Sequence, residues 1–394
     1  MLQYDSLLSK RALGLQPSGI REFFDIMAEM EDVISLGVGE PDFVTPDHIR
    51  AKGIESLKEG HTKYTSNAGM TELRKEISAY MDRTFGLHYD PIGEICVTVG
   101  GSEAIDLIIR ALINWGDEVI IPTPSFVCYG PLVELAGGVP VYVETKVENE
   151  FRLTAQELRD AITEKTKLLV LPYPSNPTGG IMEKADLEAL AEVLKDTNIM
   201  VLSDEIYAEL TYGRKHVSIA NIPGMYERTV IASGFSKAFA MTGWRMGYAC
   251  GAEALIEQVT KIHQYGIMSA PTMSQYAAIE AMRNGMEDIV VMRESYNERR
   301  QMIVDGLRKI GFDCFEPRGA FYVFPCIRSS GLSSEEFCKR LLMEESVAVI
   351  AGTAFGLGGE GFVRCCYATS KEGIQEALKR MERFLAKVKQ EQGR

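Results

Sequence analysis

The residues best suited to chemistry are a lysine and an arginine in a stretch with few other charges. Lys237 follows the short apolar run 229–232, and Arg245 lies eight residues further on. Burial disfavours the charged form of an amine, so a lysine in such a place can act as a nucleophile toward an aldehyde. Arg245 can present a planar cation to a phosphate. The two residues together predict covalent amine chemistry beside a bound anion.

Four other loops carry polar or aromatic residues directly after an apolar run. Their candidate residues are Gly101 with Ser102, Phe126, Asn176, and Asp204 with Tyr207. Ligands bind at the carboxyl ends of the strands in an open parallel sheet, so we expect these side chains to share one site with Lys237. Donors for an anion, an aromatic ring, an amide and a carboxylate together suit a charged aromatic cofactor.

Each of these loops also has an ordinary structural explanation. The Gly-Gly-Ser loop is neither G-x-G-x-x-G nor G-x-x-x-x-G-K-[ST], and alone it is more often a plain strand-to-helix turn. Asn176 lies in a strong turn sequence, Asp204 also suits a helix N-cap, and Phe126 also suits a hydrophobic core. The cofactor hypothesis therefore depends on the whole set of residues rather than on any one motif.

The elements that must position these residues follow a regular rhythm of apolar runs, Gly- or Pro-rich loops and amphipathic stretches. Strands are predicted at 95–99, 119–121, 139–143, 168–171, 199–202, 229–232 and 247–250, with helices at 102–113 and around 158–161 and 187–194. Strands that alternate with helices predict a mostly parallel central sheet flanked by helices on both faces, an α/β fold.

The two ends of the chain predict a second, smaller α/β domain. A helical stretch at 287–308 precedes alternating runs at 321–324 and 362–366, and an amphipathic helix closes the chain from 371 to about 390. We therefore expect a large domain at 47–285 and a small domain that combines 1–46 with 286–394.

Composition excludes several classes of protein. The chain has 394 residues, a net charge of -13 and no block rich in Lys or Arg, which disfavours a nucleic-acid partner. Its 8 cysteines form no C-x-x-C pair and its 5 histidines are scattered, so we expect reduced thiols and no metal site. No secretory signal and no membrane-spanning run is present, so we predict a cytoplasmic protein that acts on small molecules.

The stretch around Lys237 resembles the lysine-attachment pattern of class I/II pyridoxal-phosphate-dependent aminotransferases. Residues 234–247 agree with it at every specified place: small, apolar, small, Lys, two free, small, apolar, free, Gly, free, Arg, apolar, Gly. Further family motifs follow in family order, at 36–43, Tyr64 with Gly69 and Leu73-Arg74, 175–179, 204–207, 319–322 and 362–364. The chain is thus similar to aspartate aminotransferase-like enzymes of fold type I over roughly residues 30–370.

This resemblance implies a catalytic role for three residues. Lys237 would bind the aldehyde of pyridoxal 5'-phosphate and, once freed by the substrate, move the proton between the substrate and the cofactor. Asp204 would keep the pyridine nitrogen protonated. Tyr207, together with Asn176, would donate hydrogen bonds to the phenolic oxygen of the cofactor.

The remaining candidates would bind the cofactor or the substrate. By resemblance, Phe126 stacks on the cofactor ring, and Gly101, Ser102 and Arg245 bind its phosphate. Many family members have a phosphate-binding serine where this chain has Gly234, so Ser236 or Ser233 is expected to replace it.

The α-carboxylate of the substrate would be bound by Arg364, Gly39 and Asn176. Tyr64 would reach the phosphate of the other subunit, which implies a homodimer with its sites at the interface.

The predicted reaction moves an amino group between an L-amino acid and a 2-oxo acid, with 2-oxoglutarate as the expected acceptor. The donor stays open between aspartate and a broad or aromatic range, and Tyr265 and Ile267 are expected near the side-chain pocket. The main alternative is a β-lyase of the C–S lyase type on the same scaffold, or aminocyclopropane-carboxylate synthesis. A non-catalytic ligand sensor, a nicotinamide dehydrogenase and a serine hydrolase are weaker alternatives.

Overall fold

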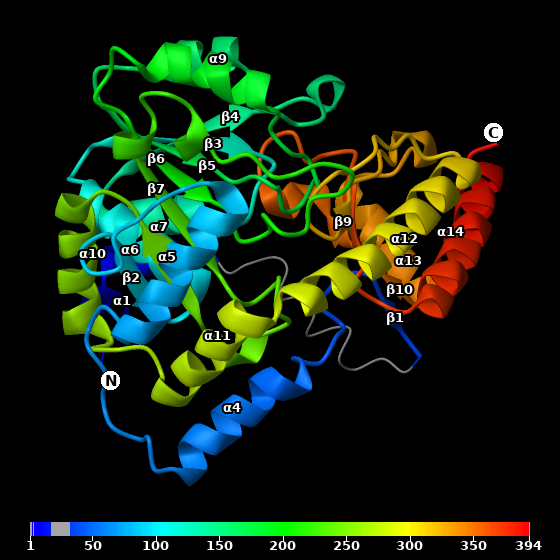
Figure 1. The fold of residues 1–394 in the computed structure, drawn as a ribbon. Coiled ribbons are helices and arrows are strands. Elements are labelled where there is room, and N and C mark those ends of the chain that lie inside the picture. Colours follow the sequence, from blue (N-terminus) through cyan, green and yellow to red (C-terminus); the bar gives the residue numbers. More distant parts are fainter. Residues whose placement is uncertain (1, 3, 17–31, 394) are drawn as a thin grey trace.

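The computed structural model describes residues 2, 4–16 and 32–393, and its centre is a seven-stranded sheet (Figure 1). In spatial order its strands are β2 (Ile95–Thr98), β8 (Gly247–Cys250), β7 (Thr229–Gly234), β6 (Met200–Asp204), β5 (Thr166–Leu171), β3 (Glu118–Thr123) and β4 (Val139–Glu144). Strand β8 is antiparallel to β2 and β7, and the other neighbouring pairs are parallel. The prediction of a mostly parallel sheet is therefore confirmed, with each strand within a few residues of its expected bounds.

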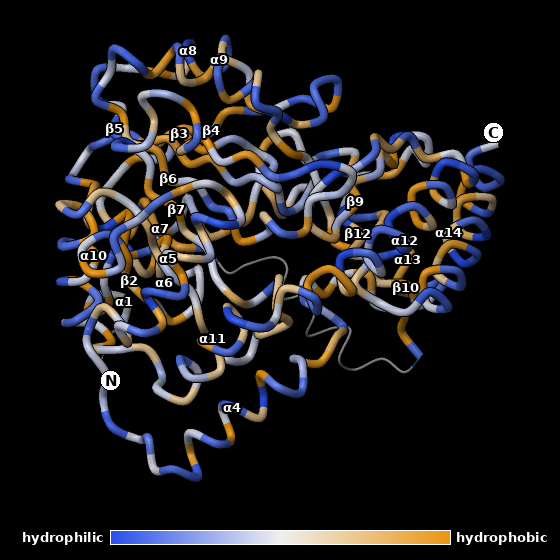
Figure 2. Tube along the Cα trace, in the orientation of Figure 1, coloured by the Kyte–Doolittle hydropathy of each residue, from blue (hydrophilic) through white to orange (hydrophobic). Residues whose placement is uncertain are grey.

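Helices cover both faces of this sheet. Successive side chains along a strand point to opposite faces, and because both sets are apolar, both faces must be covered. Leu168 and Val170 pack against one layer, formed by α6 (Gly100–Leu112), α7 (Tyr129–Ala136) and α10 (Glu253–Gly266). Leu169 and Leu171 point to the opposite layer, formed by α8 (Ala155–Ala161) and α9 (Lys184–Leu194). In Figure 2 the trace along the central strands is mostly hydrophobic, because both faces of the strands are buried.

Three further helices pack over the β2–β8 side of the sheet. They are α4 (Asp47–Lys58), α5 (Thr71–Phe85) and α11 (Thr272–Asn284), which form one hydrophobic cluster with Ile95, Val97 and Tyr248. The short helices α1 (Tyr4–Leu7) and α2 (Lys10–Gly14) precede them in the chain. Among the described residues, no helix has both the length and the hydrophobicity that crossing a membrane requires.

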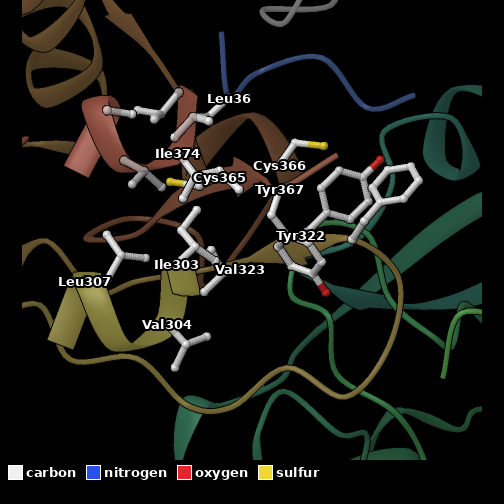
Figure 3. Packing of buried hydrophobic residues seen from close by; sticks show 14 of the residues in the cluster. Leu36, Ile303, Val304, Leu307, Tyr322, Val323, Cys365, Cys366, Tyr367 and Ile374 are labelled. Carbon is white, nitrogen blue, oxygen red and sulfur yellow. The ribbon is translucent and has the colours of Figure 1, made fainter. Parts of the chain in front are cut away.

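The C-terminal third forms a second hydrophobic core beside the large sheet (Figure 3). It contains α12 (Met286–Ile310), α13 (Ser334–Glu345), α14 (Lys371–Glu391) and a sheet of β11 (Ile350–Ala351), β12 (Val363–Cys366) and β9 (Tyr322–Val323). Strand β1 (Ile34–Ser35) joins this core by pairing in parallel with β10 (Val347–Ala348). The domain boundaries at 46/47 and 285/286 stay a prediction, and residues 17–31 of the segment assigned to the small domain lie outside the described residues.

Candidate active site

A cavity of about 340 Å³ lies where the loops after β2, β3, β5, β6 and β7 meet the second core. Tyr64, Ser233, Tyr265 and Ile267 do not line this cavity, but the other candidate site residues from the sequence do: Gly39, Gly101, Ser102, Phe126, Asn176, Asp204, Tyr207, Ser236, Lys237, Arg245 and Arg364. The lining also contains Glu40, Tyr129, Thr242 and Tyr322, for which the sequence suggested no individual role. The fold therefore brings together side chains that are more than 300 positions apart in sequence, such as Gly39 and Arg364.

Lys237 lies in the loop that follows β7, where its amine is largely removed from water. Its Nζ donates a hydrogen bond to the Gly39 carbonyl oxygen at 2.7 Å. Burial lowers the pKa of Lys237 to about 8, although Cys366 and Glu40 act in the opposite direction. About a tenth of the amine is thus unprotonated at pH 7, far more than for an ordinary lysine, and the unprotonated form is the one that attacks an aldehyde or accepts a proton.

Asp204 ends β6 with its carboxylate at the cavity wall. Its Oδ2 accepts a hydrogen bond from the Tyr129 hydroxyl at 2.6 Å, and its Oδ1 accepts one from the Ile206 amide at 3.2 Å. Burial raises the pKa of Asp204, while these two hydrogen bonds and Lys237 lower it. A carboxylate held in this way can pair with a protonated ring nitrogen.

Tyr129 is a residue that sequence reasoning missed. It begins α7 three residues after Phe126, which is about one helical turn, and the two rings meet edge-on with centroids 6.3 Å apart. A fully buried tyrosine needs a hydrogen-bond partner for its hydroxyl group. In the sequence, only the three-residue spacing from Phe126 pointed to Tyr129. The fold shows that the hydrogen-bond partner of the Tyr129 hydroxyl group is Asp204.

Tyr207 and Tyr322 form a hydrogen-bonded pair on the side of the cavity nearest the second core. Their hydroxyl oxygens are 2.8 Å apart, and burial raises the pKa of both phenols. Both hydroxyl groups therefore stay protonated and can act as donors at neutral pH. Tyr322 belonged to a family motif in the sequence, but no role had been predicted for it.

Arg364 provides a buried cation, with only 3% of the residue exposed. Its Nη1 donates to Asn176 Oδ1 at 2.9 Å and its Nη2 to the Gly37 carbonyl at 2.5 Å, while its Nε has no hydrogen-bond partner. The guanidinium carbon lies 4.6 Å from the Tyr322 ring centroid. A planar cation fixed in this way, with one buried donor unpaired, suits a carboxylate ligand.

A second anion subsite is formed where α6 begins. Gly101 and Ser102 lie in the first turn of this 13-residue helix, whose free N–H groups and dipole favour an anion. Arg245 lies so close that a Cβ on Gly100 would be 2.5 Å from Nη2 of its guanidinium. Ser236 lines the cavity, whereas Ser233 does not and instead donates to the Glu205 carbonyl at 3.4 Å.

Gly234 has a structural reason for departing from the family pattern. A Cβ at this position would lie 2.8 Å from the Met246 carbonyl oxygen and 2.9 Å from the Gly247 Cα. Both atoms belong to the backbone, one to Gly247 in β8 and one to the residue before it. Moving them would disturb the sheet and destabilise the protein. The close approach of β7 and β8 leaves no room for a serine side chain.

Three residues that the sequence singled out lie outside this cavity in the single chain, and the role expected for Tyr64 in the site of the other subunit stays a prediction. Tyr64 is 80% exposed and lies in a separate hollow of about 440 Å³ with His61, Lys63 and Tyr276. Tyr265 and Ile267, which were expected near the side-chain pocket, do not line the cavity, because Tyr265 lies on the exposed face of α10 and Ile267 ends this helix.

A buried amine, a carboxylate and two anion subsites around one cavity define an enzyme that performs amine chemistry with an anionic cofactor. The family model for class I and II aminotransferases matches residues 31–381, and the chain belongs to this family, whose members use pyridoxal phosphate. It is therefore a transaminase that acts on amino acids and 2-oxo acids.

Individual relatives match over almost the whole chain. The protein YugH of Bacillus subtilis (strain 168) is 54% identical over 97% of this chain and 99% of its own length. Aspartate aminotransferase of Pyrococcus abyssi is 46% identical, with 97% and 99% covered. The crystal structure of an aromatic aminotransferase from Pyrococcus horikoshii has a TM-score of 0.89 at 42% identity, with 94% of this chain and 100% of that chain covered.

The lining residues fit pyridoxal phosphate. The amine of Lys237 suits the aldehyde, the α6 N-terminus with Arg245 suits the phosphate, and the buried carboxylate of Asp204 suits the ring nitrogen. The 8 cysteines are all free, and among the described residues no group of three or more His, Cys, Asp or Glu side chains could hold a metal ion.

Proposed function

We propose that Lys237 is the cofactor-binding and proton-transferring residue of this aminotransferase. The observation that carries the proposal is the buried amine itself, whose pKa is lowered to about 8 inside the cavity that also contains Asp204 and Arg364. Pyridoxal phosphate, when bound, supplies an aldehyde that links to amines and a ring that takes up the electrons left on the substrate Cα. Lys237 Nζ removes the Cα proton and delivers it to the cofactor carbon that carried the aldehyde.

Arg364 binds the α-carboxylate of the amino acid and so fixes the Cα–H bond toward Lys237. Asn176 Oδ1 and the Gly37 carbonyl already hold two of its nitrogens, which keeps the guanidinium plane in place. Gly39 adds a backbone contact at the same end of the cavity. These four residues act by orientation, because proton transfer requires a donor and an acceptor in close alignment.

Asp204 holds a proton at the ring nitrogen, with Tyr129 fixing its carboxylate. Tyr207 and Asn176 donate to the phenolic oxygen, Phe126 stacks on the ring, and the subsite of Gly101, Ser102, Ser236 and Arg245 binds the phosphate. Each assignment is supported by the position of the residue on the cavity wall.

We propose that the donor is aspartate or a broader set that includes aromatic amino acids, with 2-oxoglutarate as acceptor. The names of the relatives support both choices, since one is an aspartate aminotransferase and another an aromatic aminotransferase. The family match favours transamination over the lyase and ligand-sensor alternatives.

We also propose that the working unit is a cytoplasmic homodimer, and that the chain divides into domains at 46/47 and 285/286. The exposed Tyr64, expected to reach the phosphate of the partner subunit, supports the dimer. The free state of all 8 cysteines supports a reducing compartment.

An absorbance experiment tests the proposed chemistry and identifies the donor. The holoenzyme is mixed with single amino acids, and the visible cofactor band and the released 2-oxo acid are measured. We expect the band to shift to shorter wavelength as 2-oxo acid appears, fastest with the natural donor. Release of pyruvate and ammonia with a persistent band would instead identify a lyase.

A further inference from the structure

The turn that carries Asp204 and Tyr207 has a second face, directed away from the cavity. Glu205 follows Asp204 in the sequence, is 2% exposed and does not line the cavity. A buried carboxylate is destabilising unless hydrogen bonds or charges compensate for the lost water. None of the roles assigned above uses this group, so its place behind the active site needs another explanation.

Three side-chain groups converge on the Glu205 carboxylate. The hydroxyl groups of Ser203 and Ser218 donate to Oε1 at 2.8 and 2.5 Å, and His216 Nε2 lies 3.0 Å from Oε2. An ionised carboxylate is an acceptor only, so three donors stabilise its charged form. The network is therefore built to hold a negative charge in the interior.

The Glu205 backbone connects this network to the catalytic strands. Its amide donates to the Ala232 carbonyl in β7 at 2.9 Å, and its carbonyl accepts from the Ala208 amide at 3.0 Å and from Ser233 Oγ at 3.4 Å. Strand β7 leads directly to Lys237, and β6 ends at Asp204. One residue thus connects the two strand ends that carry the principal catalytic groups.

The charge of Glu205 also acts on its neighbour. Burial is the largest cause of the raised pKa of Asp204, and the negative charge of Glu205 raises it further. A carboxylate with greater affinity for protons holds a proton more firmly on a ring nitrogen that it faces. The donors around Glu205 moderate this effect by spreading its charge.

Other titratable groups border the same interior region. Glu209, in the same turn, accepts a hydrogen bond from the Tyr80 hydroxyl through Oε1, while its Oε2 has no partner. Burial raises the pKa of Glu209. The negative charge of Glu205 also contributes to the raised pKa of the Tyr89 and Tyr248 phenols. Only Glu205 among these groups is a cause of the raised pKa of Asp204.

We propose that Glu205, held by Ser203, Ser218 and His216, is a positioning residue that fixes the catalytic turn and places a second negative charge behind Asp204. This inference rests on the proposed role of Asp204. It assigns to the second residue of the Asp-Glu-Ile-Tyr motif a function separate from that of its neighbours.

The Glu205→Gln variant removes the charge with little change of shape. His216 can accept a hydrogen bond from the new amide through Nε2 in its other tautomer, so the three contacts can persist. The pH midpoint of the visible absorbance change of the holoenzyme should fall by on the order of half a pH unit. The kcat should fall severalfold with little change in KM, because substrate contacts are untouched.

Ser218→Ala should shift the pH midpoint in the opposite direction. It also provides a test of the inference if the Glu205→Gln protein fails to fold. It keeps the charge and removes one donor, so the pH midpoint should rise. Glu209→Gln is the matched control, since it makes the same chemical change at a buried glutamate four residues further along the chain. It should lower the melting temperature and leave the pH midpoint of the absorbance change unaltered.

The outcomes separate this inference from the proposed function. Unchanged midpoints in both Glu205→Gln and Ser218→Ala, with a normal visible band in the wild type, would overturn the inference alone. A wild-type protein that forms no visible band with pyridoxal phosphate would overturn the proposed role of Lys237 instead. Opposite shifts in the two variants would support the inference, because a purely structural role predicts no such pair.

Discussion

The role proposed for Lys237 requires two properties of a single side chain. Its amine must be nucleophilic enough to bind an aldehyde and basic enough to remove a proton from carbon. Burial supplies most of the first property by disfavouring the ammonium form, and the positive charges of Arg364 and Arg245 lower the pKa of Lys237 further. The hydrogen bond to the Gly39 carbonyl keeps the amine at the cavity wall.

Burial of this amine should destabilise the cofactor-free protein at neutral pH. Its pKa of about 8 lies below the ordinary value of 10.5, so the unfolded chain binds more protons between these values and stability rises with pH there. The loss of folding stability caused by burying the amine is greatest below about pH 8 and disappears as the pH approaches 10.5. The cofactor-free Lys237→Met protein should therefore be more stable than wild type at pH 7, by on the order of 2 kcal/mol.

Urea unfolding of both cofactor-free proteins from pH 7 to 10.5 measures this difference. The advantage of Lys237→Met should shrink steadily above pH 8. A difference that stays constant with pH would show that the amine titrates as in water. The same variant should lose transamination, whereas turnover with bound cofactor would remove Lys237 from the mechanism.

Tyr129 offers a second test at the residue scale. Tyr129→Phe removes the 2.6 Å hydrogen bond to Asp204 and leaves that carboxylate with only the Ile206 amide. A hydrogen bond to a charged group contributes about 1.5–3 kcal/mol, so kcat should fall by about tenfold or more. Tyr173→Phe, which removes a buried hydroxyl that donates to the Phe151 carbonyl, is the control. An equal loss of kcat in both variants would assign Tyr129 a structural role only.

At the scale of elements, the strands of the large sheet were predictable because they are short apolar runs, which are buried on both faces in all strands except the edge strand β4. The carboxyl ends of parallel strands share one edge, so their loops could be grouped into one site before the fold was known. The pairing of β1 with β10 could not be predicted, because each has two residues and they are more than 300 positions apart. The pattern of residues within either strand contains no information about a partner so far away in the sequence.

The missed residues have a similar explanation. Tyr129 contacts Asp204 across 75 positions and Tyr322 contacts Tyr207 across 115, so neither partnership leaves a local motif. The exclusion of serine at 234 depends on how closely β8 approaches β7, which is also a property of the assembled sheet. The roles proposed for the site residues stay predictions until variants are measured.

Gly234→Ser tests that close approach directly. The new Cβ would lie 2.8 Å from the Met246 carbonyl, so β7 and β8 must separate, at a destabilisation of about 1–3 kcal/mol. The melting temperature should fall although serine is common at this position in the family. Gly243→Ser, where a new Cβ meets nothing within 4 Å, is the matched control. A stable Gly234→Ser protein with tighter cofactor binding would show that the strands yield easily.

At the scale of the whole molecule, the site is assembled from residues of the large sheet and of the second hydrophobic core. The large sheet supplies Lys237, Asp204 and the phosphate subsite, while the second core supplies Tyr322 and Arg364. The segment with Gly39 joins them, and Asp42 in the same segment makes hydrogen bonds of 2.8 and 2.7 Å to Arg299 of α12. The substrate contact proposed for Arg364 would therefore depend on how the large sheet and the second core meet.

The proposed dimer would complete this assembly, because Tyr64 does not line the cavity of its own chain and would serve the partner's site. Lys237→Ala and Tyr64→Ala proteins should each be inactive or weak at limiting pyridoxal phosphate. If Tyr64 acts across the interface, a hybrid dimer contains one intact site, and an equal mixture after subunit exchange should recover about a quarter of wild-type activity. If Tyr64 serves its own chain, no combination contains an intact site and the mixture should stay as weak as its components. Activity measured before and after exchange distinguishes the two arrangements.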